Sequence, residues 1–501
     1  MINYNEQLGY RYLDLEKGVR VGTLIQKEVT PEKVAATLAA YSRSAKSVTE
    51  LLTERHDQGV SASDKCKLII DGYGHGSVRG MGMISLFIEG ISMLDAMTIF
   101  YEFPYQNGQE RSTRYQVMKG VEDFYIPDMN PDIKKDFTSI LEYWMSCYSS
   151  LQDITKYTLS NYFKIDRNNS QETRVLKSRT LDCIRFFIPL AKRTSIGIVI
   201  NGTETSRLIK ELTEGLPSVA TGLKELLDFE GTSNLIRHTD TYPLPTKEIF
   251  ELIKDLPYKK WNTSLGNKAL SFIRNNGSPI TTNYMRVLNS LMEDTVSNTF
   301  ENKEVLYKVS KLISSYFNQY KDMGNLGRSS TINISGLTDV GSLKDYNRHR
   351  PLAKIVSLLH EESNIKSELD RPDINHLFAL PEYLNIEEFS SLKGKYEDAF
   401  KKGYNKILEF LYKWESNIEA SNLSKLTKLL LPQGHLTNFS YAGDYGEWLY
   451  IAGTRSRPGG HINYRLLTED IIKLIEQEVP EFKSNITPVN PKSREEFLDR
   501  S

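Results

Sequence analysis

A short polar segment at residues 107–116, NGQERSTRYQ, gathers side chains that are well suited to bind a phosphate group. Ser112 and Arg114 lie close together in it, with Glu110 just before them. A guanidinium binds phosphate oxygens through two parallel hydrogen bonds, and a hydroxyl beside it adds another donor. The segment therefore indicates either a socket for a phosphate and a polar ring or an ordinary solvated loop.

A second set of basic residues lies in the C-terminal half of the chain. Arg348, His349 and Arg350 are consecutive in NRHRP, and Arg455 and Arg465 follow further along. Three basic residues in a row are typical of a solvent-exposed turn. They also form a local basic site, which suits an anionic ligand.

The composition bounds the class of protein. A chain of 501 residues is long enough for two or three domains. The 39% hydrophobic and 25% charged residues are typical of soluble globular proteins. The 63 Lys and Arg residues almost balance the 64 Asp and Glu residues, which argues against a nucleic-acid partner.

Cysteine usage and apolar runs indicate the setting. Three scattered cysteines make no disulfide framework, and with eight histidines no metal-ligand spacing emerges. The N-terminus has no apolar signal region, and the run at 81–94 is too short to cross a bilayer. We expect a cytoplasmic protein with no metal site and no membrane partner.

Periodicity predicts a helix-rich α+β fold. The expected elements are a helix opened by Thr30 and Pro31, long helices at about 130–163 and 385–414, a short helix opened by Thr468, and strands at 195–201 and 438–443.

An internal repeat connects the two halves. The segment from Ile188 aligns with the segment from Leu431, so that Pro189 meets Pro432 and Asn201 meets Asp444. A long helix precedes each segment. Chance could supply several of these matches, but their common order favours two diverged copies, at residues 1–235 and 236–501.

The motifs together resemble the flavin-dependent thymidylate synthases, the ThyX family. Gly74-His75-Gly76-Ser77, FIEGIS at 87–92 and ERSTRY at 110–115 follow the order of that family's G-H-x-S, apolar segment and S-x-R-Y. PLAKRTSIGIVING, which ends at Asn201 and Gly202, resembles its L-P-x4-T strand. The resemblance implies two such units, each a mostly antiparallel sheet packed with long helices.

The resemblance assigns roles at a nucleotide site. Ser112 and Arg114, with Glu110, would bind the phosphate and ring of dUMP. Arg455 and Arg465 correspond to the family's R-x9-R pair, which implies substrate binding for Arg455 and polarisation of the uracil by Arg465. The alternative for Arg465 is a structural ion pair at helical spacing, with Glu469.

The resemblance also implies a cofactor site and a reaction. The family's R-H-R triplet, which helps to hold FAD, is matched by Arg348, His349 and Arg350. Asn201, at the end of the strand that resembles L-P-x4-T, is the other residue implied to bind the cofactor. The implied reaction is methylation of dUMP to dTMP with methylenetetrahydrofolate, FAD and NADPH. The flavin would carry the redox step.

The two copies depart from the family pattern in opposite ways. The first copy has no basic residue at Tyr101–Pro104, where R-H-R should lie, and the second has no S-x-R-Y after its triplet. We therefore expect composite sites, with Ser112 and Arg114 facing Arg465, in a homodimer that mimics the family's four-subunit assembly. The alternatives are a nucleotide-binding scaffold without catalysis and an enzyme that modifies a pyrimidine nucleotide differently.

Overall fold

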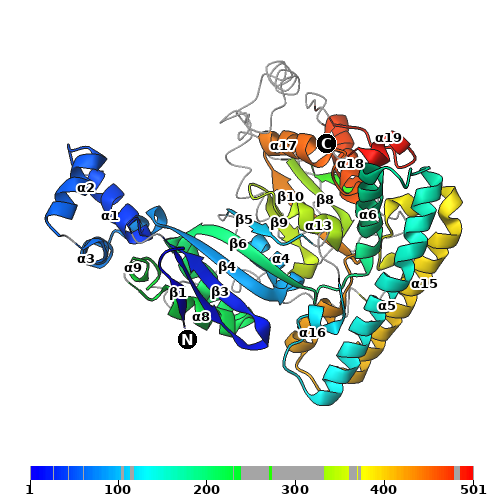
Figure 1. The fold of residues 1–501 in the computed structure, drawn as a ribbon, viewed down its shortest axis with the longest axis horizontal. Helices are drawn as coiled ribbons and strands as arrows, with labels where there is room; N and C mark the ends of the chain where they lie inside the picture. Colours follow the sequence, from blue (N-terminus) through cyan, green and yellow to red (C-terminus); the bar gives the residue numbers. More distant parts are fainter. Residues whose placement is uncertain are drawn as a thin grey trace. The chain divides into compact units, whose positions relative to one another are not determined.

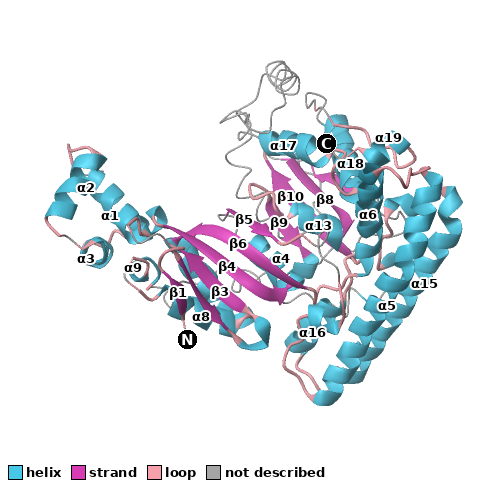
Figure 2. Cartoon of the chain, in the orientation of Figure 1, coloured by secondary structure: helices cyan, strands magenta, loops and turns pink. Residues whose placement is uncertain are grey.

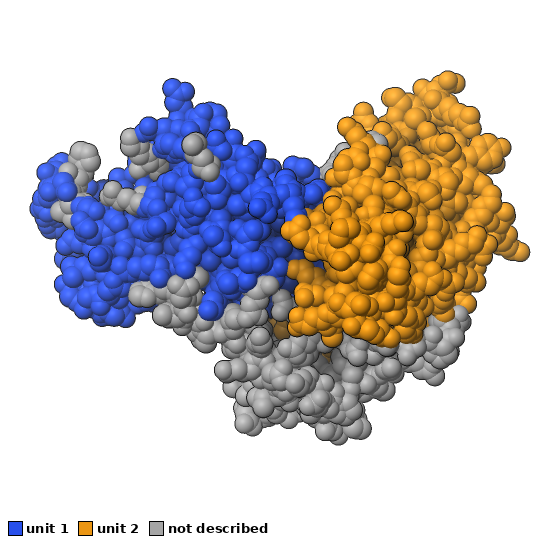
Figure 3. All heavy atoms as spheres, turned by 90° about the horizontal axis from the view of Figure 1, so that it is seen from below, with its two compact units in different colours: residues 1–112, 193–252 blue, residues 113–192, 253–501 orange. Residues whose placement is uncertain are grey.

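A computed structural model of the chain resolves into two compact units, which are coloured separately in Figure 3. Unit 1 holds residues 1–112 and 193–252, and unit 2 holds residues 113–192 and 253–501. The structure describes residues 2–25, 28–42, 44–59, 61–102, 107–112, 118–229, 231–237, 270–273, 332–359, 369, 374–478, 484 and 486–499.

Unit 1 is built on an antiparallel sheet with strand order β1-β2-β3-β4-β6-β5 (Figure 2). Alternation along β4 buries Ile84, Leu86 and Ile88 on one face, as expected for a sheet covered on one side. The strands are β1 (Asn3–Asn5), β2 (Tyr10–Asp14), β3 (Arg20–Leu24), β4 (Met83–Ser92), β5 (Asn107–Glu110) and β6 (Arg193–Asn201). The helices are α1 (Pro31–Tyr41), α2 (Val48–Asp57), α3 (Ala62–Lys67), α4 (Met93–Glu102), α7 (Gly202–Gly215), α8 (Pro217–Leu227) and α9 (Ser233–Ile236).

Unit 2 holds a second antiparallel sheet, with strand order β7-β8-β10-β9. Its strands are β7 (Leu270–Ile273), β8 (Ile332–Asp339), β9 (Ala353–Val356) and β10 (Leu436–Gly443). Its helices are α5 (Pro131–Tyr162), α6 (Ser170–Ile184), α13 (Val340–Tyr346), α15 (Ser390–Trp414), α16 (Ala420–Leu430), α17 (Tyr445–Arg455), α18 (Ile462–Glu478) and α19 (Arg494–Leu498).

The two long helices α5 and α15 lie side by side in unit 2 (Figure 1). Trp144 is fully buried between them and packs over Gly403, where a Cβ atom would lie 2.1 Å from the indole ring. Its Nε1 donates to the backbone oxygen of Leu430 at 3.0 Å. Gly403 therefore allows the helices to approach closely enough to enclose the indole.

The main predicted elements are confirmed, with one exception. Thr30 caps α1, with its side chain accepting a hydrogen bond from the backbone of Lys33, and the two long helices are α5 and α15. The predicted strands fall within β6 and β10. The helix expected to open at Thr468 is wrong in its start: α18 begins at Ile462, and Thr468 donates to the backbone oxygen of Tyr464 inside it.

The two sheets have corresponding topologies. In the order β3-β4-β6-β5 of unit 1, the third strand is β6. In the order β7-β8-β10-β9 of unit 2, the third strand is β10, so β6 and β10 occupy corresponding positions. Helix α4 follows β4 as α13 follows β8, and α7 follows β6 as α17 follows β10. The α+β class and the antiparallel sheets are confirmed by this arrangement.

The segments before β6 and β10 pair with each other within unit 2. Pro189 and Pro432, which the repeat aligns, form an antiparallel bridge. Each segment donates to the other at the same relative position, so the pairing is reciprocal. The bonds run from Leu190 N to Leu431 O (2.9 Å) and from Gln433 N to Ile188 O (2.9 Å).

The compact units do not follow the order of the chain. Helices α5 and α6 precede the predicted boundary at residue 235, yet both belong to unit 2. Within the described residues, no helix is long and apolar enough to span a membrane. Cys66, Cys147 and Cys183 are buried, and none of them forms a disulfide.

Candidate functional site

The structure brings His349 and Arg455 together in unit 2, although 106 positions separate them in the sequence. Arg455 Nε donates to His349 Nε2 at 2.7 Å. On the other side of the ring, His349 Nδ1 lies 3.0 Å from Glu447 Oε1. The R-H-R triplet and one arginine of the R-x9-R pair are therefore parts of one hydrogen-bonded cluster.

Helix starts and ends position these groups. Helix α13 is capped by Asp339, whose side chain accepts from the backbone of Ser342, and it ends just before the triplet. The backbone N–H of His349 donates to Tyr346 O at 2.9 Å, and the imidazole contacts Glu447 and Arg455 of α17. Glu447 lies in the first turn of α17 and Arg455 is its last residue.

The donor properties of arginine fix the tautomer of His349. A guanidinium Nε–H only donates, so Nε2 of the imidazole must accept. The imidazole proton then lies on Nδ1 and is donated to Glu447. Burial, assisted by Arg455 and Lys354, lowers the pKa of His349 well below its usual value, in agreement with a neutral ring.

Burial also shifts the ionisation of the two flanking groups. It raises the pKa of Glu447 to about 7, and Asp444 adds to the effect against the opposing charges of Lys354 and Arg455. Burial lowers the pKa of Lys354 to about 7, with Glu447 opposing. The Lys354 ammonium donates to Asn347 O at 2.6 Å. Both groups therefore change charge close to neutral pH.

The Arg455 side chain is held at one end only. Its guanidinium carbon lies 5.7 Å from the centre of the Tyr464 ring. Among the residues that the structure describes, its one hydrogen bond is the Nε bond to His349. The two terminal nitrogens are thus available to an anionic or carbonyl oxygen. Arg348 and Arg350, on either side of His349 in the sequence, are half-buried, and burial lowers the pKa of Arg350.

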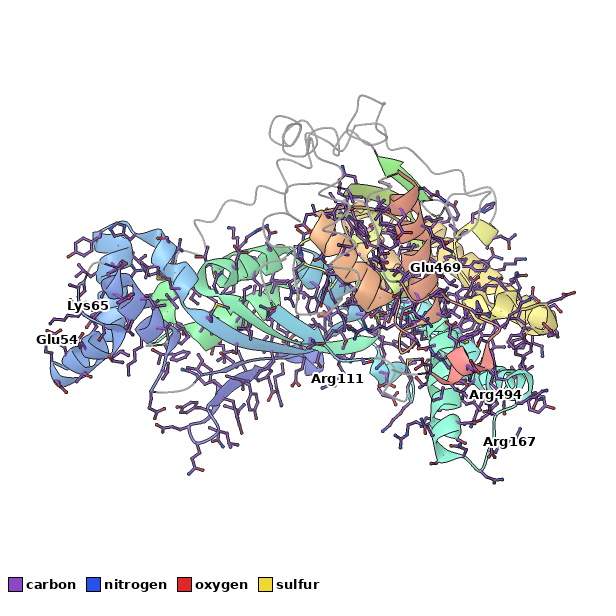
Figure 4. The ribbon with its side chains drawn as sticks, turned by 90° about the horizontal axis from the view of Figure 1, so that it is seen from above. Glu54, Lys65, Arg111, Arg167, Glu469 and Arg494 are labelled. Carbon is purple, nitrogen blue, oxygen red and sulfur yellow. The ribbon has the colours of Figure 1, made fainter. Side chains whose placement is uncertain are left out.

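Arg465 is placed differently, with 1% of its surface exposed. Its Nε donates to Ser456 O at 3.0 Å, and its Nη1 lies 2.8 Å from Glu496 Oε1. The alternative pair with Glu469 does not form: Glu469, labelled in Figure 4, pairs with Lys473 and accepts a hydrogen bond from the backbone of Val489. The role of Arg465 in polarising a uracil stays a prediction.

The first-half segment begins at the end of β5 in unit 1. Glu110 is buried and accepts a hydrogen bond from Thr194 Oγ1 at 3.1 Å. The next residue, Arg111, is exposed at the edge of the sheet (Figure 4), with its Nη2 3.8 Å from Glu89 Oε1. Ser112 is half-buried, and Arg114 lies outside the described residues.

Asn201 ends β6 and caps α7. Its side chain accepts from the backbone N–H of Glu204 at 2.9 Å, which satisfies a free donor of the helix. Asp444 caps α17 in the same way, accepting from Glu447 N at 2.8 Å. Asn201 therefore has a structural function, and its contact with a cofactor stays a prediction.

Sequence reasoning missed Glu447 and Lys354. Glu447 could have been found, because Asp444-x-x-Glu447 has the spacing of a helix cap followed by a first-turn carboxylate. Lys354 offers no such signal. Among the described residues, no group of three or more His, Cys, Asp or Glu side chains is arranged to hold a metal ion.

Comparison with known proteins identifies a family over part of the chain. Residues 23–214 match the model of the thymidylate synthase complementing protein family. This match confirms the predicted family resemblance over the range that holds Glu110, Ser112, Arg114 and Asn201.

Two curated relatives are named UPF0159 proteins. The one from Chlamydia muridarum is 28% identical over 162 residues, which is 30% of this chain and 30% of the relative. The one from Chlamydia pneumoniae is 28% identical over 209 residues, 36% of this chain and 39% of the relative. The chain thus spans about a third of the length of the curated relatives it matches.

Solved structures give a distant likeness. A flavin-dependent thymidylate synthase ThyX from Helicobacter pylori, complexed with FAD and dUMP, is 13% identical with a TM-score of 0.29. The match covers 43% of this chain and 96% of that one.

Proposed function

We propose that this chain, whose residues 23–214 match the thymidylate synthase complementing protein family, is a flavin-dependent thymidylate synthase-like enzyme. It would methylate dUMP to dTMP, with methylenetetrahydrofolate and NADPH as co-substrates. The geometric observation that carries the proposal is the His349–Arg455 hydrogen bond of 2.7 Å, which unites two motifs that the family resemblance selects independently.

Arg455 is the group best prepared to contact the nucleotide in unit 2. Its Nε is fixed by His349, so its planar end is held in one orientation before a ligand arrives. A guanidinium fork binds a phosphate or carbonyl oxygen and stabilises negative charge on it. Arg465 can do this only after Glu496 has been displaced from it.

We also assign nucleotide binding to the segment that follows β5. Ser112 and Arg114 would bind the phosphate. Glu110 is a buried carboxylate whose Oε1 accepts from Thr194, and it would accept a hydrogen bond from the pyrimidine ring. These assignments follow the family resemblance and the match over residues 23–214.

Arg348 and Arg350 of unit 2 would bind FAD, because their charges suit its pyrophosphate. The family resemblance separately proposes the side-chain amide of Asn201, in unit 1, as a flavin contact. His349 is engaged on both sides by Glu447 and Arg455, so we do not assign it a direct flavin contact. FAD supplies the redox chemistry when bound, and the protein supplies position and charge.

We further infer that the chain is a diverged tandem duplication, with copies at 1–235 and 236–501. The corresponding strand orders of the two sheets and the reciprocal bonds around Pro189 and Pro432 support it. Two chains would then provide four units as a homodimer in the cytoplasm. Sedimentation of the purified protein tests the dimer.

Flavin and nucleotide binding test the function directly. The purified protein should be yellow, release FAD on denaturation, and melt at a higher temperature with dUMP, because a ligand of the native state stabilises it. Arg114→Ala should weaken dUMP binding by about 2–3 kcal/mol, the usual effect of losing a charged partner. The matched control is Arg167→Ala, since Arg167 is an exposed arginine of unit 2 (Figure 4).

A nucleotide-binding scaffold without catalysis is the second candidate. The observation that favours it is the burial of Arg465 against Glu496, which occupies the group expected to polarise the uracil. A colourless protein that binds dUMP, ignores added FAD and forms no dTMP would establish the scaffold. A colourless protein that binds neither ligand would rule out both candidates.

A further inference from the structure

We propose that Glu447 is a positioning residue that, through His349, aims the terminal nitrogens of Arg455 at an oxygen of the nucleotide. The inference rests on the proposed function and extends it to a residue outside the family motifs. Glu447 Oε1, the His349 ring and Arg455 Nε form one continuous chain, with donor-to-acceptor distances of 3.0 and 2.7 Å.

The chain of bonds has a single direction. Arg455 Nε–H donates to His349 Nε2, and His349 Nδ1–H donates to Glu447, so an acceptor is required at the far end. A second proton on the imidazole would bring two N–H groups against each other at Nε2. The side chains of His349 and Glu447 are only 4% and 9% exposed, so water cannot readily take the place of either partner.

The carboxylate of Glu447 is not needed to begin α17. Its backbone N–H, not its side chain, is bonded to the Asp444 cap. Glu204 occupies the same place in α7, behind the Asn201 cap, and its carboxylate lies 3.8 Å from Arg207 of the same helix. An equivalent helix start thus forms without a series of hydrogen bonds from carboxylate to imidazole to guanidinium. That series is found in the half of the protein that keeps R-H-R.

The surroundings make the chain sensitive to pH. Burial raises the pKa of Glu447 to about 7, so the acceptor loses its charge as the pH falls below neutrality. A neutral carboxyl accepts the Nδ1–H bond more weakly than a carboxylate. The titratable and charged groups facing this chain are Asp444, Lys354, Arg348, Arg455, Tyr346, Tyr450 and Tyr464.

Calorimetric titration with dUMP between pH 6 and 8.5 tests the inference. The wild type should bind more weakly as the pH falls through about 7. Glu447→Ala should bind about tenfold more weakly at pH 8, the effect of losing one charged hydrogen-bond partner. Glu447→Gln keeps an acceptor oxygen, so it should retain most of the affinity at pH 8 but lose the pH step. Glu204→Gln, the matched control, should keep both the wild-type affinity for dUMP and the pH step.

The tautomer of His349 provides a readout that needs no nucleotide. Nitrogen NMR of the wild type should show a neutral Nδ1–H imidazole for His349, identified by its loss in His349→Gln, and Glu447→Ala should change that signal. If Glu447→Ala fails to fold, Glu447→Gln still decides through its pH profile.

The titration distinguishes failure of the proposed function from failure of this inference. A wild type that binds no dUMP overturns the proposed function. If the wild type binds dUMP, and Glu447→Ala and Glu447→Gln bind it with the wild-type affinity and the wild-type pH profile, this inference alone is overturned.

Discussion

The starts of α7 and α17 have the same backbone design and different chemistry. In both, the last residue before the helix caps it by accepting from a glutamate N–H, Asn201 from Glu204 and Asp444 from Glu447. The Glu204 side chain then turns to Arg207 of its own helix, whereas that of Glu447 reaches the imidazole of His349 on a separate element. Local sequence therefore sets the helix start, and the tertiary neighbour decides what its carboxylate can do.

The two ends of the corresponding strands β5 and β9 differ in a complementary way. Thr194 donates to the carboxylate of Glu110 in unit 1, and Thr437 shares a hydrogen bond of 3.0 Å with Ser357 in unit 2. The hydrogen-bond partner of the corresponding threonine is thus a buried carboxylate in unit 1 and a hydroxyl in unit 2.

The largest expected effect concerns stability and separates Arg465 from Arg455. Arg465→Ala leaves Glu496 without its buried cation, which typically costs about 3–5 kcal/mol. The free energy of unfolding, measured by urea denaturation, should fall by that order. Lys413→Ala is the control, because Lys413 pairs with Asp136 at an exposed site where a salt bridge is worth under about 1 kcal/mol. An Arg465→Ala protein as stable as the wild type would contradict the structural role.

Arg455→Lys should affect binding rather than stability. Lysine keeps the charge and loses the planar fork, so two oxygens can no longer be bound at once. We expect dUMP affinity to fall about tenfold, roughly the loss of one charged hydrogen bond, with little change in the melting temperature. Arg457→Lys provides the control two positions along the chain. Equal affinities for the two variants would remove Arg455 from the site.

The paired caps should have equal effects on stability and unequal effects on pH. Asn201→Ala and Asp444→Ala should each lower the free energy of unfolding by about 1 kcal/mol, the usual loss for a helix cap. Only Asp444→Ala removes a negative charge that raises the pKa of Glu447. The pH step in dUMP binding should therefore move to lower pH in Asp444→Ala and stay in place in Asn201→Ala.

The sequence predicted what depends on local order. The long helices followed from their periodicity, and the start of α1 followed from its cap Thr30. The two Pro-x4-Thr segments indicated the correspondence between β6 and β10. The start of α18 was missed because Thr468 resembles an N-cap but lies inside the helix, where its hydroxyl bonds to the preceding turn.

Contacts between distant residues could not be predicted in the same way. The sequence selected His349 and Arg455 separately, but nothing in their spacing indicates that these residues, 106 positions apart, form a hydrogen bond. Arg465 shows the converse. It matched a motif, and only the fold shows that Glu496, near the C-terminal end, is its partner.

A further expected effect is the pH dependence of folding to which Glu447 and Lys354 contribute. The pKa of Glu447 is raised from 4.5 to about 7 in the fold, so the native state binds more protons than the unfolded state between these values. Stability must then fall as the pH rises through that window. The pKa of Lys354 is lowered from 10.5 to about 7, so its contribution rises with pH above neutrality. The unfolding free energy of the wild type, relative to that of Glu447→Gln, should therefore fall from pH 5 to pH 7.5, measured by urea denaturation. The corresponding difference for Glu204→Gln should be flat, and a flat difference for Glu447→Gln as well would mean that burial does not hold the proton on Glu447.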